Sequence, residues 1–458
     1  MAMKQINLNQ TRHLILLPIL FSFISLSSSF GNPLSEVGKS PSALQEPLAA
    51  AKYFRLMVHG DGATSATLGF AASSNKISDH RIYYDSIDHG RNIKNYRQSA
   101  QPSLINEYLE MNNAFVRLSN LLPDTAYYFV IQDSKGLSNR FWFKTAPSNT
   151  KSRLSIIAGG DSRNNRVPRK AANLMVSKLR PHAIMFSGDM TGGGTSREWQ
   201  EWFEDWQLTI SSDGRMYPLL AARGNHESSN EMIAKLFDTP SGVYFASYFG
   251  GNLLRVYTLN TESGIAGDQT RWLDQDLMLN HTALWKFAQY HKPMRPHTSG
   301  KSEGSNQYRY WAPVFEKYGV QLVSEADSHT VKTTWPIRPS SGPGSDQGFL
   351  RDDENGTIYI GEGCWGAPLR SNNDNKSWTR DSGRFNHFHW ILIDENRMEV
   401  RVVKVDNANS VASLTDQNLF IMPKGIELWT PANGSVVVRN LGPKNSFLVK
   451  EIRREVSP

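Results

Sequence analysis

Cysteine is almost absent from this sequence of 458 residues, which contains only Cys364. A single cysteine cannot form an internal disulfide, so a chain of this size must be stabilised by packing alone. Cys364 directly precedes Trp365, and such a run favours a packed thiol over a reactive one. The sequence therefore excludes an internally disulfide-bonded scaffold and gives no support to a cysteine nucleophile.

Long hydrophobic runs are also missing beyond the N-terminal segment, where no stretch approaches the ~20 apolar residues that a membrane span needs. In that segment, Lys4 and Arg12 precede an apolar run over residues 14–24, and small residues follow. This order predicts a signal peptide over residues 1–31, and hence a secreted or periplasmic protein with no membrane span after signal removal. An uncleaved N-terminal anchor is the alternative that this run leaves open.

Charge of one sign is not concentrated in any part of the chain. The sequence has 50 Lys and Arg against 43 Asp and Glu, a net charge of +7. Such an excess would suit an anionic substrate or a nucleic acid, but the basic residues are scattered. We therefore expect no specific nucleic-acid partner. The hydrophobic content of 39% is ample for buried cores, so we expect a globular chain with room for more than one domain.

Short alternating apolar runs, separated by turn residues, occupy the region 52–147. They predict an N-terminal antiparallel β-sandwich. The runs lie at residues 54–58, 66–70, 81–84, 114–118 and 127–131. The preceding residues 32–51 are rich in Pro, Ser and Gly and are interpreted as a linker.

One segment of this region, Leu122 to Tyr127, resembles the tyrosine corner of fibronectin type III domains. A tyrosine in that position can hydrogen-bond back across the corner and fix the loop. The resemblance implies a fibronectin type III-like sandwich, of the kind that forms the N-terminal domain of purple acid phosphatases.

Residues 148–410 show a different pattern, in which buried strands alternate with helical stretches. We expect strands at 154–158 and 183–186 and helices at 171–178, 199–206 and 269–277. This alternation predicts a layered α/β domain with its site on loops at strand ends. Later runs at 390–393 and 398–403 are expected to complete the same sheet layer. Residues 411–458 are interpreted as a C-terminal β-rich extension.

Four strand-to-loop junctions in this second region carry polar side chains that can bind metals. In each, a ligand-type side chain follows an apolar run, and in three of them glycine allows the backbone to turn tightly. The junctions are Gly159-Gly160-Asp161, Gly188-Asp189, Gly224-Asn225-His226-Glu227 and Tyr290-His291. The dipeptide Gly60-Asp61 has the same letters but lies in the sandwich region, where a turn is expected.

In this order the four blocks resemble those of the calcineurin-like metallophosphoesterases, and together with the sandwich they resemble the purple acid phosphatases in particular. The resemblance spans roughly residues 52–405 and implies a layered αββα domain that binds two metal ions. It implies that Asp161 binds the first metal and that Asp189 bridges both. Asn225 and His291 would bind the second metal.

The resemblance also implies two residues that act on the substrate. His226 matches the histidine that faces the phosphate and assists the leaving group. Arg163 stands where wider members of the family have another histidine; a guanidinium cannot bind a cation, but its fork can hold a pair of phosphate oxygens.

Two positions depart from the family pattern. The last block, normally Gly-His-x-His, corresponds to the segment Ser324 to His329. His329 would complete the first metal site, and Asp327 would replace a histidine on the second metal, where a carboxylate favours harder ions. Gly192 stands where purple acid phosphatases have the tyrosine that stabilises ferric iron. We therefore expect two divalent ions, Mn, Zn or Fe, in place of a purple centre.

Other histidines and basic residues have simpler interpretations. His387 and His389 alternate on one strand face, and we expect a structural or rim role for them. Arg295 and His297 follow His291 in a loop and could contact substrate or be solvated. His182, before the second strand, is interpreted as structural.

These observations predict an exported dinuclear-metal phosphatase that hydrolyses phosphate monoesters of small molecules by attack of metal-activated water. A phosphodiesterase with the same metal centre is the nearest alternative, because both reactions use the same attack. A binding protein with a degenerate metal site is the third, suggested by Asp327 and Gly192. The natural substrate and the oligomeric state do not follow from the sequence.

Overall fold

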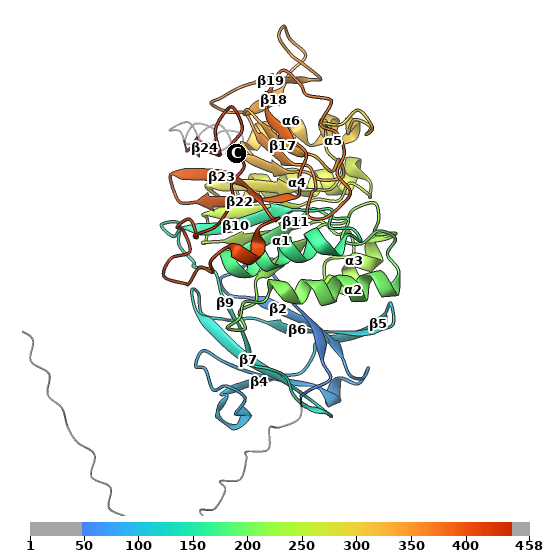
Figure 1. Ribbon diagram of the computed structural model, residues 1–458, viewed down its shortest axis with the longest axis vertical. Coiled ribbons are helices and arrows are strands. Elements are labelled where there is room, and N and C mark those ends of the chain that lie inside the picture. The colour runs from blue at the N-terminus through green and yellow to red at the C-terminus, as the bar shows by residue number, and fades with distance from the viewer. Residues whose placement is uncertain (1–47, 442–458) are drawn as a thin grey trace, which may run out of the picture. The chain divides into compact units, whose positions relative to one another are not determined.

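A computed structural model describes residues 48–441 of the chain (Figure 1). The expected signal peptide and most of the expected linker lie outside these residues. Within them, no helix combines the length and the apolar composition that a membrane crossing requires.

The N-terminal region is a sandwich of two antiparallel layers, as predicted. The strands of the first layer are β1 (Lys52–Met57), β2 (Ala66–Ala72), β5 (Leu104–Tyr108) and β6 (Met111–Leu118). Those of the second are β3 (Arg81–Asp85), β4 (Gln98–Ala100), β7 (Ala126–Asp133), β8 (Gly136–Leu137) and β9 (Phe141–Lys144). The inward-facing side chains of both layers, such as Leu68, Phe70, Val116 and Phe129, form one buried cluster.

The tyrosine corner expected from the sequence is present. The backbone N–H of Leu122 donates a hydrogen bond to Tyr127 Oη at 2.9 Å. Asp61 also behaves as expected for a turn, because its Oδ1 accepts from the backbone N–H of Ala63 at 2.9 Å. Both contacts fix loops of the sandwich, and the carboxylate of Asp61 is used to stabilise its own turn.

The second region has four layers in the order αββα. The first sheet contains β10 (Leu154–Gly159), β11 (Ala183–Phe186), β12 (Pro218–Ala221), β22 (His387–Ile393), β23 (Arg397–Lys404) and β24 (Val436–Asn440). The second contains β13 (Phe245–Phe249), β14 (Leu254–Thr258), β15 (Trp285–Gln289), β16 (Leu322–Ser324), β17 (Val331–Thr334), β20 (Ile358–Gly361) and β21 (Thr379–Gly383). A small hairpin, β18 (Ile337–Pro339) and β19 (Phe349–Arg351), lies apart from both.

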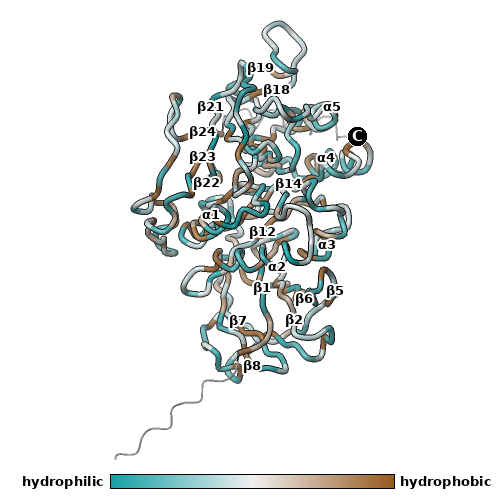
Figure 2. Tube along the Cα trace, turned by 45° about the vertical axis from the view of Figure 1, so that its right-hand side comes forward, coloured by the Kyte–Doolittle hydropathy of each residue, from teal (hydrophilic) through white to brown (hydrophobic). Residues whose placement is uncertain are grey.

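Helices cover the outer face of each sheet. The first sheet packs against α1 (Arg166–Leu179), α2 (Ser196–Trp206) and α3 (Asn230–Phe237), and Figure 1 shows α1 in front of β10 and β11. The second sheet packs against α4 (Thr270–Leu279), α5 (Ser305–Tyr310) and α6 (Ala312–Tyr318). Between the two sheets lies a third apolar cluster that includes Ile156, Met185 and Phe287. Figure 2 shows brown and teal residues interleaved along the trace, as expected for elements with one buried face.

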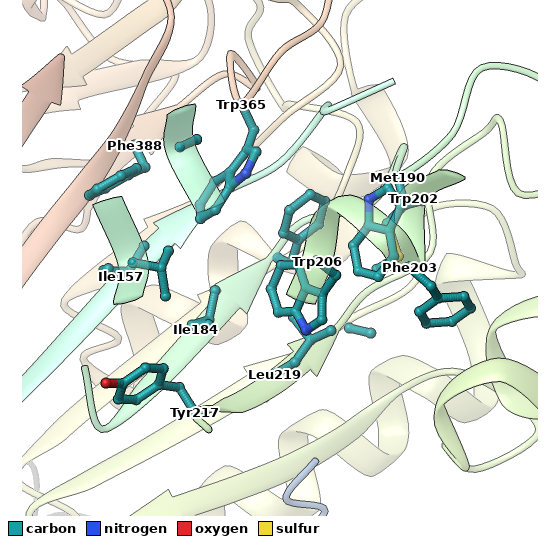
Figure 3. Close-up of a cluster of buried hydrophobic side chains, with 14 of the residues drawn as sticks. Ile157, Ile184, Met190, Trp202, Phe203, Trp206, Tyr217, Leu219, Trp365 and Phe388 are labelled. Atoms are coloured by element: carbon teal, nitrogen blue, oxygen red, sulfur yellow. The ribbon is translucent and has the colours of Figure 1, made fainter. Parts of the chain in front are cut away.

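The aromatic residues of α2 explain how this helix is held. Trp199, Trp202, Phe203 and Trp206 follow the 3.6-residue helical period and are all buried. Trp202 and Trp206 stack on each other with ring centroids 4.8 Å apart. Figure 3 shows Trp202, Phe203 and Trp206 of this helix, with Ile184 and Leu219 of the neighbouring strands in the same cluster. The packing anchors the loops at the ends of β11 and β12.

The sandwich and the αββα region share one sheet. Strand β1 pairs in parallel with β12, with Leu56 opposite Pro218 and Met57 opposite Leu219. The result is a continuous ten-stranded sheet that runs from β24 to β5. Within the described part of the expected C-terminal extension, β24 pairs with β23 and forms the other edge of this sheet.

Candidate metal centre

The polar residues singled out in the sequence all follow strands whose ends meet at one edge. Strands β10, β11 and β12 are parallel neighbours, and so are β15 and β16. The carboxyl ends of these strands are followed by Asp161, Asp189, Asn225, His291, Asp327 and His329. All six predicted metal ligands therefore lie at the same end of the two central sheets of the αββα region.

The first group of contacts joins Asp161 and His329. His329 Nε2 lies 3.0 Å from Asp161 Oδ1, and its Nδ1 lies 2.8 Å from the carbonyl oxygen of Pro368. The other carboxylate oxygen of Asp161 accepts a hydrogen bond from the backbone N–H of Asp327 at 2.8 Å. Asp161 is fully buried, and burial raises the pKa of its carboxyl.

The second group surrounds the ring of His291. Its Nδ1 lies 2.9 Å from the carbonyl oxygen of Ser187, which assigns the proton to Nδ1. Its Nε2 then faces three oxygens: Asn225 Oδ1 at 3.0 Å, Asp189 Oδ1 at 3.2 Å and Asp327 Oδ1 at 3.5 Å.

Asp189 is close to members of both groups. Ligand atoms of Asp161, Asp189 and His291 all lie within 4.8 Å of one another, and the three residues are buried. Asp189 Oδ1 accepts from the backbone N–H of His226 at 2.9 Å, while Oδ2 lies 3.3 Å from Arg163 Nη1. Burial opposes ionisation of Asp189, but His291 and the His226 amide hold its pKa at about 2.

This arrangement fits a cation. In both groups a backbone carbonyl fixes Nδ1 of a histidine, so that the lone pair of Nε2 points at carboxylate and amide oxygens. Lone pairs that face each other in a buried site are favourable only when a proton or a metal ion lies between them. The set of imidazole, carboxylate and amide groups is one that Zn, Mn and Fe accept.

The backbone at the site is strained in a consistent way. Asp161, Arg163, Asp189, Asp327 and His329 all have positive φ angles between 47° and 66°. Such left-handed conformations are uncommon for residues other than glycine and persist where the surrounding structure enforces them. Their concentration at these strand ends marks a functional site.

Two glycines make room for the carboxylates. A Cβ atom on Gly224 would collide with Asp189 Oδ1, and one on Gly363 would collide with Asp161 Oδ2. Gly224 was part of a recognised block, whereas Gly363 lies in the segment after β20 and no motif in the sequence indicated it. Its role follows only from the approach of two distant segments.

His226 is oriented by the loop that precedes α2. Its Nδ1 contacts the carbonyl oxygen of Gly192, and its Nε2 lies 3.8 Å from Asp189 Oδ2. The loop itself is fixed by Glu198, which accepts from the backbone N–H groups of Gly193 at 3.1 Å and Thr195 at 3.0 Å. The imidazole is partly exposed and presents Nε2 to the space beside the ligands.

Gly192 stands where a purple centre has its tyrosine, and it packs against the side chain of Asn164. Its backbone N–H donates to Asn164 Oδ1 at 2.9 Å, and a Cβ atom at this position would collide with the same side-chain amide. A tyrosine here would require the exposed Asn164 side chain to move.

Glu227 is a buried residue of the Gly-Asn-His-Glu block to which the sequence assigned no separate role. Its carboxylate accepts from the backbone N–H groups of Asp189 at 3.0 Å, Met190 at 2.8 Å and Gly224 at 2.7 Å. Burial and the nearby Asp189 raise the pKa of Glu227 to about 7. Glu227 joins the loop after β11 to the loop after β12.

Lys301 is another residue that the sequence did not indicate. Its Nζ lies 2.5 Å from Asp327 Oδ1, the same oxygen that faces His291. Burial opposes ionisation of Asp327, but His291 and Lys301 together hold the pKa of Asp327 well below its ordinary value. No pattern around Lys301 predicts this contact, because it joins the loop after β15 to the loop after β16.

The expectation that Arg295 and His297 contact substrate or solvent is wrong. His297 is fully buried and its Nε2 lies 2.7 Å from Thr379 Oγ1. Arg295 is nearly buried and donates to the carbonyl oxygen of Gln347 at 2.6 Å. Both side chains stabilise the loop after β15, because hairpin residues and β21 cover it.

The structural interpretations of the remaining residues agree with the model. His387 and His389 lie buried on β22 with ring centroids 5.0 Å apart, and His389 stands opposite Ala158 of β10. His182 accepts at Nδ1 from the backbone N–H of Ser155 at 3.1 Å. Cys364 is a free, buried thiol, and burial raises its pKa well above the ordinary value.

Comparison with known proteins finds a family whose model matches the segment that carries these residues. The model of the calcineurin-like phosphoesterase family matches residues 161–331, which contain every predicted ligand. Two uncharacterized proteins of Mycobacterium tuberculosis, MT2654 and Rv2577, are each 22% identical to this chain over 328 residues. The match covers 58% of this chain, and the chain spans about 60% of the length of these curated relatives.

Solved structures show the same fold. Purple acid phosphatase PPD1 of yellow lupin superposes with a TM-score of 0.68 at 12% identity, over 87% of this chain and 76% of the lupin chain. The structure of PhoD superposes with a TM-score of 0.59 at 10% identity, over 91% of this chain and 99% of the PhoD chain. At such low identity the likeness concerns the fold alone. Residues 161–331 of this chain therefore match the calcineurin-like phosphoesterase family model, and the fold around them is that of these solved phosphatase structures.

Proposed function

We propose that this chain is an exported phosphatase that uses two divalent ions to hydrolyse phosphate monoesters of small molecules. The observation that carries the proposal is that Asn225 Oδ1 and Asp327 Oδ1 converge on His291 Nε2, while His329 Nε2 meets Asp161, and that ligand atoms of Asp161, Asp189 and His291 lie within 4.8 Å of one another. One carboxylate between two sets of ligands is what a bridged metal pair requires.

In this proposal, Asp161 and His329 hold one ion, while Asn225, His291 and Asp327 hold the other. Asp189 contacts both. Two divalent ions bound there would supply an activated water and offset the charge of the phosphate. The protein contributes the spacing, because Asp189 is fixed by the His226 amide and by the loops that Glu227 joins.

Arg163 is proposed to hold the phosphate. Its guanidinium lies 3.3 Å from Asp189 Oδ2 and its side chain is 21% exposed, so it borders the ligands without being sealed from the substrate. Its Nε is without a hydrogen-bond partner in the described part of the chain. A guanidinium can bind two phosphate oxygens at once, which would orient the ester for in-line attack.

His226 is proposed to assist the leaving group. The Gly192 carbonyl fixes its Nδ1 and leaves Nε2 beside Asp189. A proton on Nε2 can be donated to the oxygen of the departing alcohol as the ester bond breaks. Export is proposed from the N-terminal segment alone, which lies outside the described residues.

The test is hydrolysis by purified protein of 4-nitrophenyl phosphate and bis(4-nitrophenyl) phosphate, before and after chelation and with Mn²⁺ or Zn²⁺ added back. We expect hydrolysis of the monoester to be lost on chelation and restored by metal. Faster hydrolysis of the diester would indicate a phosphodiesterase instead. Metal binding without hydrolysis of either ester, or no metal binding, would support the degenerate site and contradict the proposal.

A further inference from the structure

Asp327 is the carboxylate at the position where the family has a neutral histidine, and it is paired with an ammonium group. Lys301 Nζ lies 2.5 Å from Asp327 Oδ1. Asp327 is almost fully buried, with 7% of its side chain exposed, and Lys301 is 23% exposed. A contact between a buried carboxylate and a partly buried ammonium is a charge-assisted hydrogen bond.

The two residues come from different loops. Lys301 lies in the segment that follows His291, and its backbone N–H donates to the carbonyl oxygen of Thr298 at 3.3 Å. Asp327 follows β16 and is fixed by its backbone N–H, which donates to Asp161 Oδ2 at 2.8 Å. The ammonium therefore approaches from the side of the His291 loop onto an oxygen that already faces His291 Nε2 at 3.5 Å.

The charges of this pair add up to zero. Replacing a neutral imidazole by a carboxylate adds one negative charge to a metal site, and Lys301 adds one positive charge on the same oxygen. A compact ammonium group is a point charge that acts over this short distance with little screening, because the partner is buried. The carboxylate and the ammonium together present the second site with the net charge of one neutral histidine.

We propose that Lys301 is the charge-balancing partner of Asp327, so that the Asp327–Lys301 pair replaces one histidine ligand of the second metal. The inference rests on the proposed function, because it concerns the metal that Asp327 would bind. Lys301 acts through Asp327 and is not a catalytic residue. A neutral histidine can then replace Asp327 without loss of metal affinity only if the charge of Lys301 is removed as well.

The experiment compares the two single variants with the double variant. Asp327→His alone would leave an unpaired ammonium next to an imidazole and a bound cation, and repulsion should weaken the second metal at least tenfold. Asp327→His combined with Lys301→Met removes that charge and should restore the lost affinity. Lys301→Met alone leaves the carboxylate uncompensated, which should strengthen binding of the second metal at least about threefold.

The measurements are metal stoichiometry by elemental analysis and calorimetric titration of the chelator-treated full chain with Mn²⁺ and with Zn²⁺. Lys317→Met is the matched control, because Lys317 forms an exposed pair with Asp274 at 3.2 Å on the surface of α6 and α4. It should leave both metal affinities unchanged.

Equal affinities in Asp327→His and the double variant would overturn the inference. Should Asp327→His not fold, unchanged or weaker metal binding in Lys301→Met would overturn it as well. Failure of the proposed function has a different signature, since the unmodified chain would then bind fewer than two ions. A single ion held by His291 and Asp327 would still bind more tightly in Lys301→Met if the inference holds.

Discussion

The Glu227 carboxylate accepts a hydrogen bond from the backbone N–H of Asp189 at 3.0 Å. Asp189 is close to members of both groups of ligands, so the contact fixes the main chain of the central carboxylate while its side chain remains free for metal. Two further amides, those of Met190 and Gly224, donate to the same glutamate. One buried side chain thus sets the separation of two strand ends.

Glu227→Gln tests this positioning role. Glutamine retains only one acceptor oxygen and directs an NH₂ group at backbone donors, so we expect a loss of about 1–3 kcal/mol in the free energy of unfolding. Displacement of Asp189 should lower kcat by about 10- to 100-fold, as for residues that support metal ligands. The control is Glu231→Gln, whose exposed carboxylate pairs with Lys235 on α3. Equal kcat values in the two variants would contradict the role.

His226→Ala tests the assignment of the leaving-group donor. A missing donor matters most when the departing alcohol is a poor leaving group. We expect kcat for an alkyl phosphate to fall by about 100-fold or more, and kcat for 4-nitrophenyl phosphate to fall much less. The check is the ratio of the two rates in the wild type and the variant; a uniform loss would assign His226 to metal or phosphate binding.

Asp189→Asn and Asp61→Asn compare two aspartates that share a Gly-Asp dipeptide. Loss of the central carboxylate should reduce bound metal and lower turnover by at least about 100-fold. Asp61 caps a turn of the sandwich through Ala63, so its variant should retain full turnover and lose about 1 kcal/mol of stability at most. Metal content and initial rate, measured together, distinguish the two sites.

The protein loaded with iron is expected to lack a purple colour. Ferric–tyrosinate absorption needs a phenolate on the metal, and Gly192 packs against the Asn164 amide at the corresponding position. The measurement is the visible spectrum of the iron-reconstituted protein. An intense band that disappears on iron removal would show that another phenolate reaches the metal.

His182 should make the fold sensitive to acid. Burial, followed by Arg215 and Lys144, lowers the pKa of His182 from 6.5 to about 3, and its Nδ1 accepts from Ser155. The unfolded chain binds this proton below pH 6.5 and the folded chain does not, so stability is complete above pH 6.5 and falls towards pH 3. Because the ring is only partly buried, we expect a loss of about 1–2 kcal/mol.

The matched variant is His182→Asn, whose side-chain oxygen can accept the same hydrogen bond without titrating in this range. Denaturant unfolding of the chelated protein at pH 7 and pH 4.5 gives the comparison. The variant should lose less stability than the wild type on acidification. Equal losses would assign the acid sensitivity to other groups.

Much of this fold and part of its site could be predicted from local patterns. The four blocks that contain Asp161, Asp189, Asn225 and His291 each place a ligand after an apolar strand, and parallel strands bring such positions to one edge. The tyrosine corner at Tyr127 is equally local. In these cases the information lies within a few consecutive residues, which is the range that hydrophobic period and turn chemistry describe.

The remaining features depend on segments that are distant in sequence. Lys301 meets Asp327 only because the loops after β15 and β16 lie side by side. Gly363 is required only because its backbone passes against Asp161. His297 looked like a solvated loop residue, but Glu362, directly after β20, and Thr379 of β21 lie against it. No local period reports on such encounters, since they are fixed by the packing of the whole domain.

The pairing of β1 with β12 means that the N-terminal sandwich also protects an edge of the sheet that carries the metal ligands. If the sandwich were removed, β12 would lose its hydrogen-bonded neighbour β1, which pairs with it at Leu56 and Met57. The backbone amides and carbonyls along that side of β12 would then be unpaired. An unpaired, apolar strand border of this kind is a template for association with other chains. The αββα region expressed without the sandwich is therefore expected to aggregate through this edge. Any other domain that took the place of the sandwich would have to supply a strand that pairs with β12.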